Sequence, residues 1–160
     1  MHADHSGPEY HKPMDPIFLK EYSSEKRFVL YEAGAYTALC GDVVVFRALG
    51  GAFAGSSIDL IFLGLVYFEM PNLLQGVRVW QPRDESALQF GRSFAPQYGE
   101  ELGDKVYAVE SNGKRFHAIA ANFWVHVHRA LNRVSALTPL NDLDARDEYL
   151  ERYVKDWYKV

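Results

Sequence analysis

The sequence predicts an α+β domain made mostly of antiparallel β-sheet, with one C-terminal α-helix packed on a face of the sheet. Three observations lead to this prediction. Asn112-Gly113 lies between two alternating segments, which is a strong local signal for a β-hairpin. Segments rich in β-branched and aromatic residues occupy much of residues 27–69. The final segment, from Asn141, instead repeats apolar side chains at helical spacing.

Length, charge and cysteine content limit the class of protein. We expect a mobile leader over residues 1–16, which are rich in Pro and His, followed by one domain over residues 17–160. The net charge of −4 provides no field that attracts nucleic acid. The longest apolar region is too short to cross a membrane, so we expect no membrane partner. The single cysteine, Cys40, excludes an internal disulfide and is expected in the core of a cytoplasmic, bacterial-type protein.

The first half of the domain reads mainly as strands. Residues 16–22, "PIFLKEY", could form a short helix, and residues 27–32 alternate as a strand does. Residues 35–49 fit two short strands, or one strand with a bulge at Gly41. The Gly-rich residues 50–57 are interpreted as a hairpin connection rather than a phosphate loop, because no helix follows them. The strand that does follow, residues 58–69, is almost continuously apolar and should be buried on both faces.

The second half adds a strand, a polar region, the hairpin and the helix. Residues 77–82 alternate, and residues 83–104 are polar, with one or two helical turns at Asp84–Phe90. The hairpin spans Lys105–Ala118 and turns at Asn112-Gly113. The predicted C-terminal helix has an apolar stripe formed by Leu143, Leu150, Tyr153, Val154 and Trp157.

The stretch "FWVHVH" contains the most direct signal for chemistry. On a strand, His126 and His128 point to the same face and could both contact one zinc ion, although a metal site needs a third ligand. His117 is the candidate. It would lie opposite His126 if residues 121–122 formed a tight hairpin turn, but it would have the opposite parity if residues 115–128 formed one extended strand. The second alternative is favoured, which leaves the two histidines partly exposed without a tightly held metal.

No sequence motif indicates catalysis. The chain lacks G-x-S-x-G, H-E-x-x-H, C-x-x-C, G-x-G-x-x-G and a phosphate-loop signature. Asp42, Asp59 and Glu69 interrupt apolar strands, but each is expected near a strand end, in contact with solvent. We therefore expect a structural role for these carboxylates rather than acid–base chemistry.

Aromatic and arginine residues concentrate around the polar region, and this composition is typical of a protein-binding hot spot. The residues expected on this surface are Arg78, Trp80, Arg83, Phe90, Arg92, Phe94 and Tyr98. The leading hypothesis is a small non-catalytic protein that binds another protein, as an immunity-type module does, and that could also form a homodimer. Two alternatives remain: a zinc-dependent protein that uses His126 and His128, and a small-ligand carrier with an aromatic-lined pocket.

Overall fold

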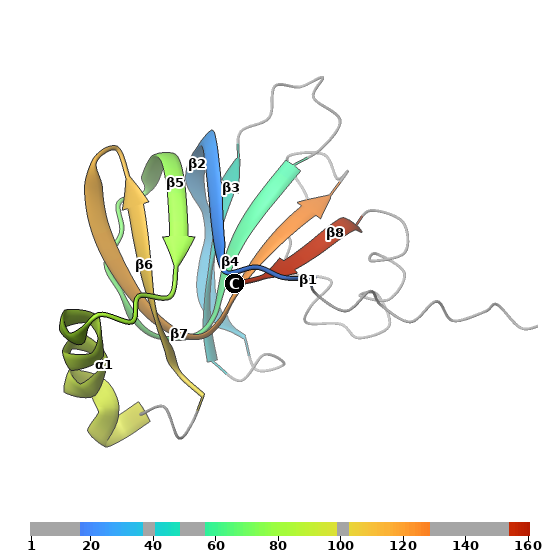
Figure 1. Ribbon diagram of the computed structural model, residues 1–160. Coiled ribbons are helices and arrows are strands. Elements are labelled where there is room, and N and C mark those ends of the chain that lie inside the picture. The colour runs from blue at the N-terminus through green and yellow to red at the C-terminus, as the bar shows by residue number, and fades with distance from the viewer. Residues whose placement is uncertain (1–16, 37–40, 49–56, 99–102, 129–153) are drawn as a thin grey trace, which may run out of the picture.

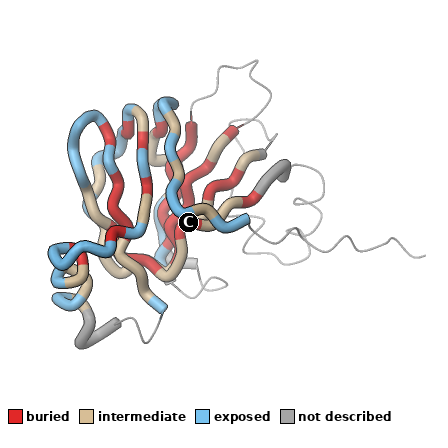
Figure 2. Tube along the Cα trace, viewed as in Figure 1, coloured by how far each residue is buried: buried red, intermediate tan, exposed pale blue. Residues whose placement is uncertain are grey.

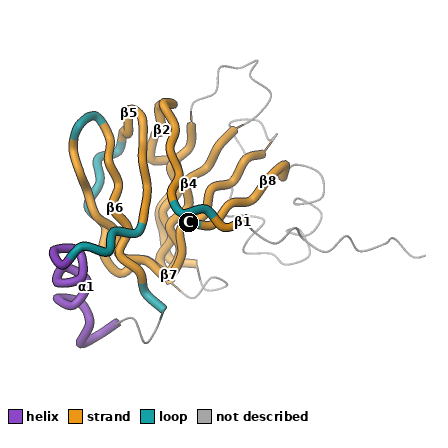
Figure 3. Tube along the Cα trace, viewed as in Figure 1, coloured by secondary structure: helices purple, strands orange, loops and turns teal. Residues whose placement is uncertain are grey.

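The computed structural model describes residues 17–36, 41–48, 57–98, 103–128 and 154–160. These residues form eight strands and one helix (Figures 1 and 3). The strands are β1 (Ile17–Phe18), β2 (Glu21–Tyr36), β3 (Gly41–Ala48), β4 (Ser57–Phe68), β5 (Leu73–Trp80), β6 (Lys105–Ser111), β7 (Lys114–His128) and β8 (Val154–Lys159). The helix, α1 (Glu85–Tyr98), lies between β5 and β6 in the chain.

Six of the strands form a closed sheet. Their order is β2-β3-β4-β7-β6-β5, and β5 pairs again with β2, so that every neighbouring pair in the ring is antiparallel. β8 and β1 extend the sheet outward from β7, and β1 pairs with β8 in parallel. A closed sheet of this size has an interior that side chains can fill completely.

β7 joins the ring to its outward extension. Its first part, up to Ala120, pairs with β6, and its last part, from Trp124, pairs with β8. β4 lies along the other edge of β7 from Ala118 to His128. In the segment between Ala120 and Trp124, β8 therefore replaces β6 as the neighbour of β7. Backbone groups on this edge of the segment need hydrogen-bond partners from outside the ladder.

A left-handed glycine allows β4 and β7 to bend together at that same segment. Gly64 has φ of 63°, and a Cβ atom there would lie 2.9 Å from the Cβ of Ala121. The bend reverses which residues point inward. In β4 the inward residues are the even-numbered Leu60 and Phe62 before the bend and the odd-numbered Leu65 after it. In β7 they are Ala118 and Ala120 before the bend and Phe123 and Val125 after it.

The interior of the ring is apolar and aromatic. The Phe62 ring contacts those of Phe123, Tyr107 and Phe68, with centroids 4.6, 6.1 and 6.3 Å apart. The buried cluster consists of Phe28, Val44, Phe46, Ala48, Leu60, Phe62, Leu74, Val77, Val79, Tyr107, Val109, Ala118, Ala120, Phe123, Val125 and Val160.

β3 and β4 are also buried on their outward faces (Figure 2). Val43, Val45, Ile61 and Leu63 alternate with the interior residues and are at most 5% exposed. The prediction that residues 58–69 are buried on both faces is therefore confirmed over residues 59–63, whereas Ile58 and the end of β4 are only half-buried.

The predicted α+β class with a C-terminal helix is wrong, because the structure is mostly β and its one described helix is α1 in the middle of the chain. Val154–Lys159 is a strand, and Trp157 pairs with His126 of β7. The helical spacing of the stripe is overridden because pairing with the edge of β7 supplies backbone hydrogen bonds to this segment. Leu143 and Leu150 lie outside the described residues.

Two local predictions have opposite outcomes. The short helix predicted over residues 16–22 is wrong, since Ile17–Phe18 and the start of β2 are strands that complete the edges of the sheet. The hairpin is confirmed, because Ser111 pairs with Lys114 around Asn112 and Gly113, whose φ angles of 50° and 73° are those of a type I′ turn. The leader, Cys40 and the Gly-rich connection of residues 50–56 lie outside the described residues.

α1 is the one helix in the described part of the chain, and it is neither long nor apolar enough to cross a membrane.

Replacing Gly64 with Ala should lower the free energy of unfolding by about 2–3 kcal/mol, because it adds both left-handed strain and a steric conflict with Ala121. Gly113→Ala is the matched control. It has a similar positive φ with no atom within 4 Å of the new Cβ, and should cost only about 1 kcal/mol. Urea unfolding of the two variants measures the difference. Adding Ala121→Gly to Gly64→Ala should restore part of the loss, and equal destabilisation by Gly64→Ala and Gly113→Ala would contradict the bend.

Candidate functional site

A pocket of about 490 Å³ lies where β5 and β6 separate. The two strands pair only from Arg78–Glu110 to Trp80–Ala108. Pro82 follows β5 closely and has no N–H group to donate, so the ladder cannot continue past Trp80. The chain then turns away into α1, and the space between the separated strands remains open.

Asp84 starts α1 beside this opening. Its Oδ1 accepts a hydrogen bond of 2.8 Å from the Ala87 N–H, as an N-cap residue does. This hydrogen bond is the main cause that lowers the pKa of the Asp84 carboxyl, and the nearby Arg115 guanidinium acts in the same direction. The Asp84 carboxylate therefore occupies the N-terminus of α1 beside the opening.

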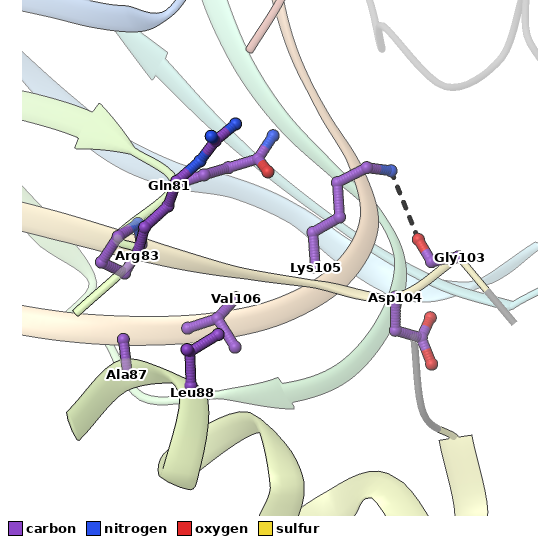
Figure 4. A pocket seen from close by; sticks show the side chains of 9 residues that line it. Gln81, Arg83, Ala87, Leu88, Gly103, Asp104, Lys105 and Val106 are labelled. Atoms are coloured by element: carbon purple, nitrogen blue, oxygen red, sulfur yellow. Dashed lines mark hydrogen bonds between the residues drawn. The ribbon is translucent and has the colours of Figure 1, made fainter. Parts of the chain in front are cut away.

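The lining of the pocket divides into a polar and an apolar side (Figure 4). Gln81, Arg83 and Lys105 lie on one side of the view, and Val106, Ala87 and Leu88 lie on the other. The complete lining, called here the β5–β6 pocket, is Gln81, Pro82, Arg83, Ala87, Leu88, Gly103, Asp104, Lys105 and Val106. Two cationic side chains and an amide therefore share a pocket with an apolar wall.

Lys105 occupies an inward-facing position of β6, two residues before the buried Tyr107. Its Nζ donates to the Ala121 carbonyl at 2.7 Å and to the Gly103 carbonyl at 3.3 Å. The Ala121 carbonyl belongs to the segment of β7 between its β6 and β8 ladders, so Lys105 satisfies an acceptor that no strand pairs with there. Partial burial lowers the pKa of the Lys105 ammonium, and the charge of Lys159 acts in the same direction.

Asp104 and Tyr107 show that this end of the ring is partly shielded from water. Burial raises the pKa of the Asp104 carboxyl, and the opposing effect of the Lys105 charge does not cancel the shift. Burial likewise raises the pKa of the Tyr107 phenol, whose hydroxyl donates to the Val160 carbonyl at 3.4 Å. Charges placed here interact more strongly than they would in bulk water.

The residues expected on an aromatic binding surface divide among three places. Arg83 lines the β5–β6 pocket. Arg78 and Trp80 lie on the outer face of β5, where the Trp80 ring is 4.3 Å from the Arg78 guanidinium and 5.2 Å from that of Arg115. Arg92 is exposed on α1 and pairs with Glu85 at 3.2 Å.

Phe90 and Phe94 lie between α1 and the sheet. Both rings pack on Tyr67, with centroids 5.2 and 5.0 Å away, and Phe90 also contacts the His117 ring at 5.0 Å. Both rings are half-buried, so their main role is to pack α1 against the sheet rather than to form an exposed binding surface. The side chain of Tyr98 lies outside the described residues.

His126 belongs to a buried row of side chains that crosses the outer face of four strands. Strand register aligns Arg47, Asp59, His126 and Trp157 across β3, β4, β7 and β8. Arg47 donates to both carboxylate oxygens of Asp59, at 2.7 and 2.9 Å, and its guanidinium covers the Tyr31 ring at 3.9 Å. The His126 ring packs on Trp157, with centroids 3.6 Å apart. The row is a structural ion pair with a stacked histidine beside it.

The prediction that His126 is partly exposed is wrong, since it is 1% exposed. Likewise Asp59, expected near solvent, is fully buried and paired with Arg47. The single extended strand over residues 115–128 is confirmed as β7. Because β7 bends at Ala121, His117 nevertheless faces outward as His126 does, but it lies near the other end of the strand.

In the described part of the structure, His117 and His126 do not meet at one metal site. His117 contacts Glu69, with Nδ1 and Oε1 3.6 Å apart, whereas His126 packs on Trp157. Among the described residues, no three His, Cys, Asp or Glu side chains form a group that could hold a metal ion. The side chain of His128 is not described, so zinc binding by the His126–His128 pair stays a prediction.

Sequence reasoning found Arg83 but missed Lys105, Gln81 and the apolar wall of the pocket. One signal was present. Lys105 has the same parity as Tyr107 and Val109, and a lysine at an inward position of a strand indicates an unusual partner or an opening. The placement of Gln81 and Pro82 in the same pocket as Val106 depends on strand register, which the sequence does not display.

Comparisons with protein-family models, curated proteins and solved structures found no match to this chain. Function is therefore inferred from the chemistry of the β5–β6 pocket.

Replacing Arg47 with Met should lower the free energy of unfolding by about 3–5 kcal/mol, because Asp59 would remain as a buried charge without its bidentate partner. The double variant Arg47→Met, Asp59→Leu should regain much of that loss, since no buried charge remains. Chemical denaturation of both variants measures this coupling. A double variant at least as unstable as Arg47→Met alone would contradict the assignment of the pair as a buried structural ion pair.

Proposed function

We propose that this chain is a binding protein for a small amphipathic carboxylate, which it holds in the β5–β6 pocket. The observation that supports this most is the joint presence of Arg83 and Lys105 beside the apolar side chains of Val106, Leu88 and Ala87. A volume of about 490 Å³ is within the range of small-molecule sites.

The pocket is lined by two cations, Arg83 and Lys105, and by one carboxylate, Asp104, so its net charge favours an anion. Within the described residues, neither Arg83 nor Lys105 forms an ion pair with a carboxylate. A guanidinium binds a carboxylate through two parallel hydrogen bonds, which makes Arg83 the principal anion contact. The Lys105 ammonium adds charge from a partly shielded position, and the apolar wall accepts the hydrocarbon part of the ligand.

The Arg83→Gln variant should bind 4-methylbenzoate about tenfold more weakly than the native chain, since it loses a charged hydrogen-bond donor. Isothermal titration calorimetry measures the affinity, and methyl shifts of Val106 and Leu88 in NMR spectra locate the ligand. Arg92→Gln is the matched control, because Arg92 is an exposed arginine of α1 that does not line the pocket. Equal weakening by both substitutions, or equal binding of the uncharged 4-methylbenzamide, would contradict an anion site at Arg83.

Carboxylate affinity should fall as the pH rises from neutrality toward 10.5. Lys105 carries its charge below its pKa, and that pKa lies below the ordinary value of 10.5 because the side chain is partly buried. The contribution of the ammonium is therefore fully present at neutral pH and is lost as the pH rises through the lowered pKa. In the Lys105→Arg variant, which stays charged, titrations across the same pH range should show a flatter profile. Parallel profiles for the two proteins would show that Lys105 does not contribute.

A second candidate function is protein binding through the outer face of β5. The Trp80 ring between two guanidinium groups is typical of interface hot spots, and Arg78 is about half exposed although it pairs with Glu21. Affinity capture with the native chain and with a Trp80→Ser variant tests this proposal. A partner retained equally by both proteins does not use this face.

A further inference from the structure

We propose that the Lys105 amine forms a reversible imine with small aldehydes that carry an anionic group, and that Arg83 holds this group in the same pocket. The inference rests on the proposed binding function and assigns a specific ligand class to it. It depends on the position of Nζ, its two hydrogen-bond partners and the second cation in the pocket.

The first observation is how the Lys105 nitrogen is held. Its two acceptors, the carbonyls of Ala121 and Gly103, come from separate segments of the chain and fix the end of an otherwise flexible side chain (Figure 4 shows the contact to Gly103). A neutral amine has two N–H groups and one lone pair. When both N–H groups donate to carbonyls, the lone pair is the remaining site of reaction on this nitrogen.

The second observation is the surroundings of that amine. Lys105 lines a pocket large enough for an aromatic or short aliphatic aldehyde, and it is half-buried. Partial burial and the nearby charge of Lys159 both increase the fraction of free amine at a given pH. Arg83 lines the same pocket and can hold a carboxylate of the ligand, so that attack by the amine becomes effectively intramolecular.

The chemistry requires only the aldehyde. The lone pair of Nζ attacks the carbonyl carbon, a C–N bond forms, and the carbonyl oxygen takes a proton to give a carbinolamine. Nitrogen then loses its remaining proton while the hydroxyl group leaves with a proton as water, and a C=N bond forms. The net change is one amine and one aldehyde to one imine and one water, without oxidation or reduction.

The test uses the full chain and 4-formylbenzoate as the probe. Sodium borohydride reduces any imine to a stable secondary amine, and peptide mapping by mass spectrometry locates the label. We expect Lys105 to be labelled about tenfold faster than the exposed Lys20, Lys26 and Lys114 in the same molecule. These three lysines are internal controls, so the result does not depend on the folding of a Lys105 variant.

Two further arms identify the role of charge. Arg83→Gln should slow labelling of Lys105 by 4-formylbenzoate by a larger factor than its labelling by uncharged benzaldehyde. Excess 4-methylbenzoate, which cannot form an imine, should protect Lys105 from 4-formylbenzoate in the native chain. The Arg92→Gln variant should behave as the native chain does.

Each outcome separates this inference from the proposed function. Binding of 4-methylbenzoate in the pocket without preferential labelling of Lys105 overturns the imine and leaves the proposed function standing. Preferential labelling that is equal for both aldehydes and is not competed by 4-methylbenzoate overturns the anionic class of ligand. Absence of both binding and preferential labelling overturns the inference and the proposed function together.

Discussion

Closure of the six-stranded ring through β7 is the constraint on which the rest of this structure depends. β7 must pair with β6 in its first part and with β8 in its last part while keeping β4 along its other edge. A straight strand cannot follow both neighbours, so β4 and β7 bend together at Gly64 and Ala121. The close approach of these two residues leaves no space for a Cβ atom on Gly64, and its positive φ is an angle that other residues rarely adopt.

The same constraint produces the candidate site. Where β7 exchanges β6 for β8, residues 121–123 have no ladder partner on that edge of the strand, and Lys105 Nζ and the Val160 N–H donate to the Ala121 and Phe123 carbonyls instead. On the other side of β6, Pro82 ends pairing with β5 and opens the pocket. Lys105 thus has a structural acceptor on β7 and a pocket beside it. A lysine held in this way is fixed in position, which favours both anion binding and reaction at its nitrogen.

The neighbours of each polar residue decide whether it is buried and paired within the sheet or lines the pocket. Arg47 and Asp59 are fully buried but satisfy each other through two hydrogen bonds, and His126 packs on Trp157 in the same row. Such a row aligns the four strands that carry it, because a register shift would separate the charges. Arg83 and Lys105 have no carboxylate partner within ion-pair distance in the described ranges, and both line the pocket.

The sequence by itself determined the features that depend on neighbours along the chain. These are the type I′ turn at Asn112-Gly113, the buried character of β4, the extended course of β7 and the presence of Arg83 in the polar region that follows β5. Only the tertiary structure decided that Val154–Lys159 is a strand, that His126 and Asp59 are buried, and that Lys105 lines a pocket with Arg83. The physical reason is that these outcomes depend on which strand edges meet. Pairing of β8 with the edge of β7 outweighs helical spacing, and the bend at Gly64 changes which side chains face inward.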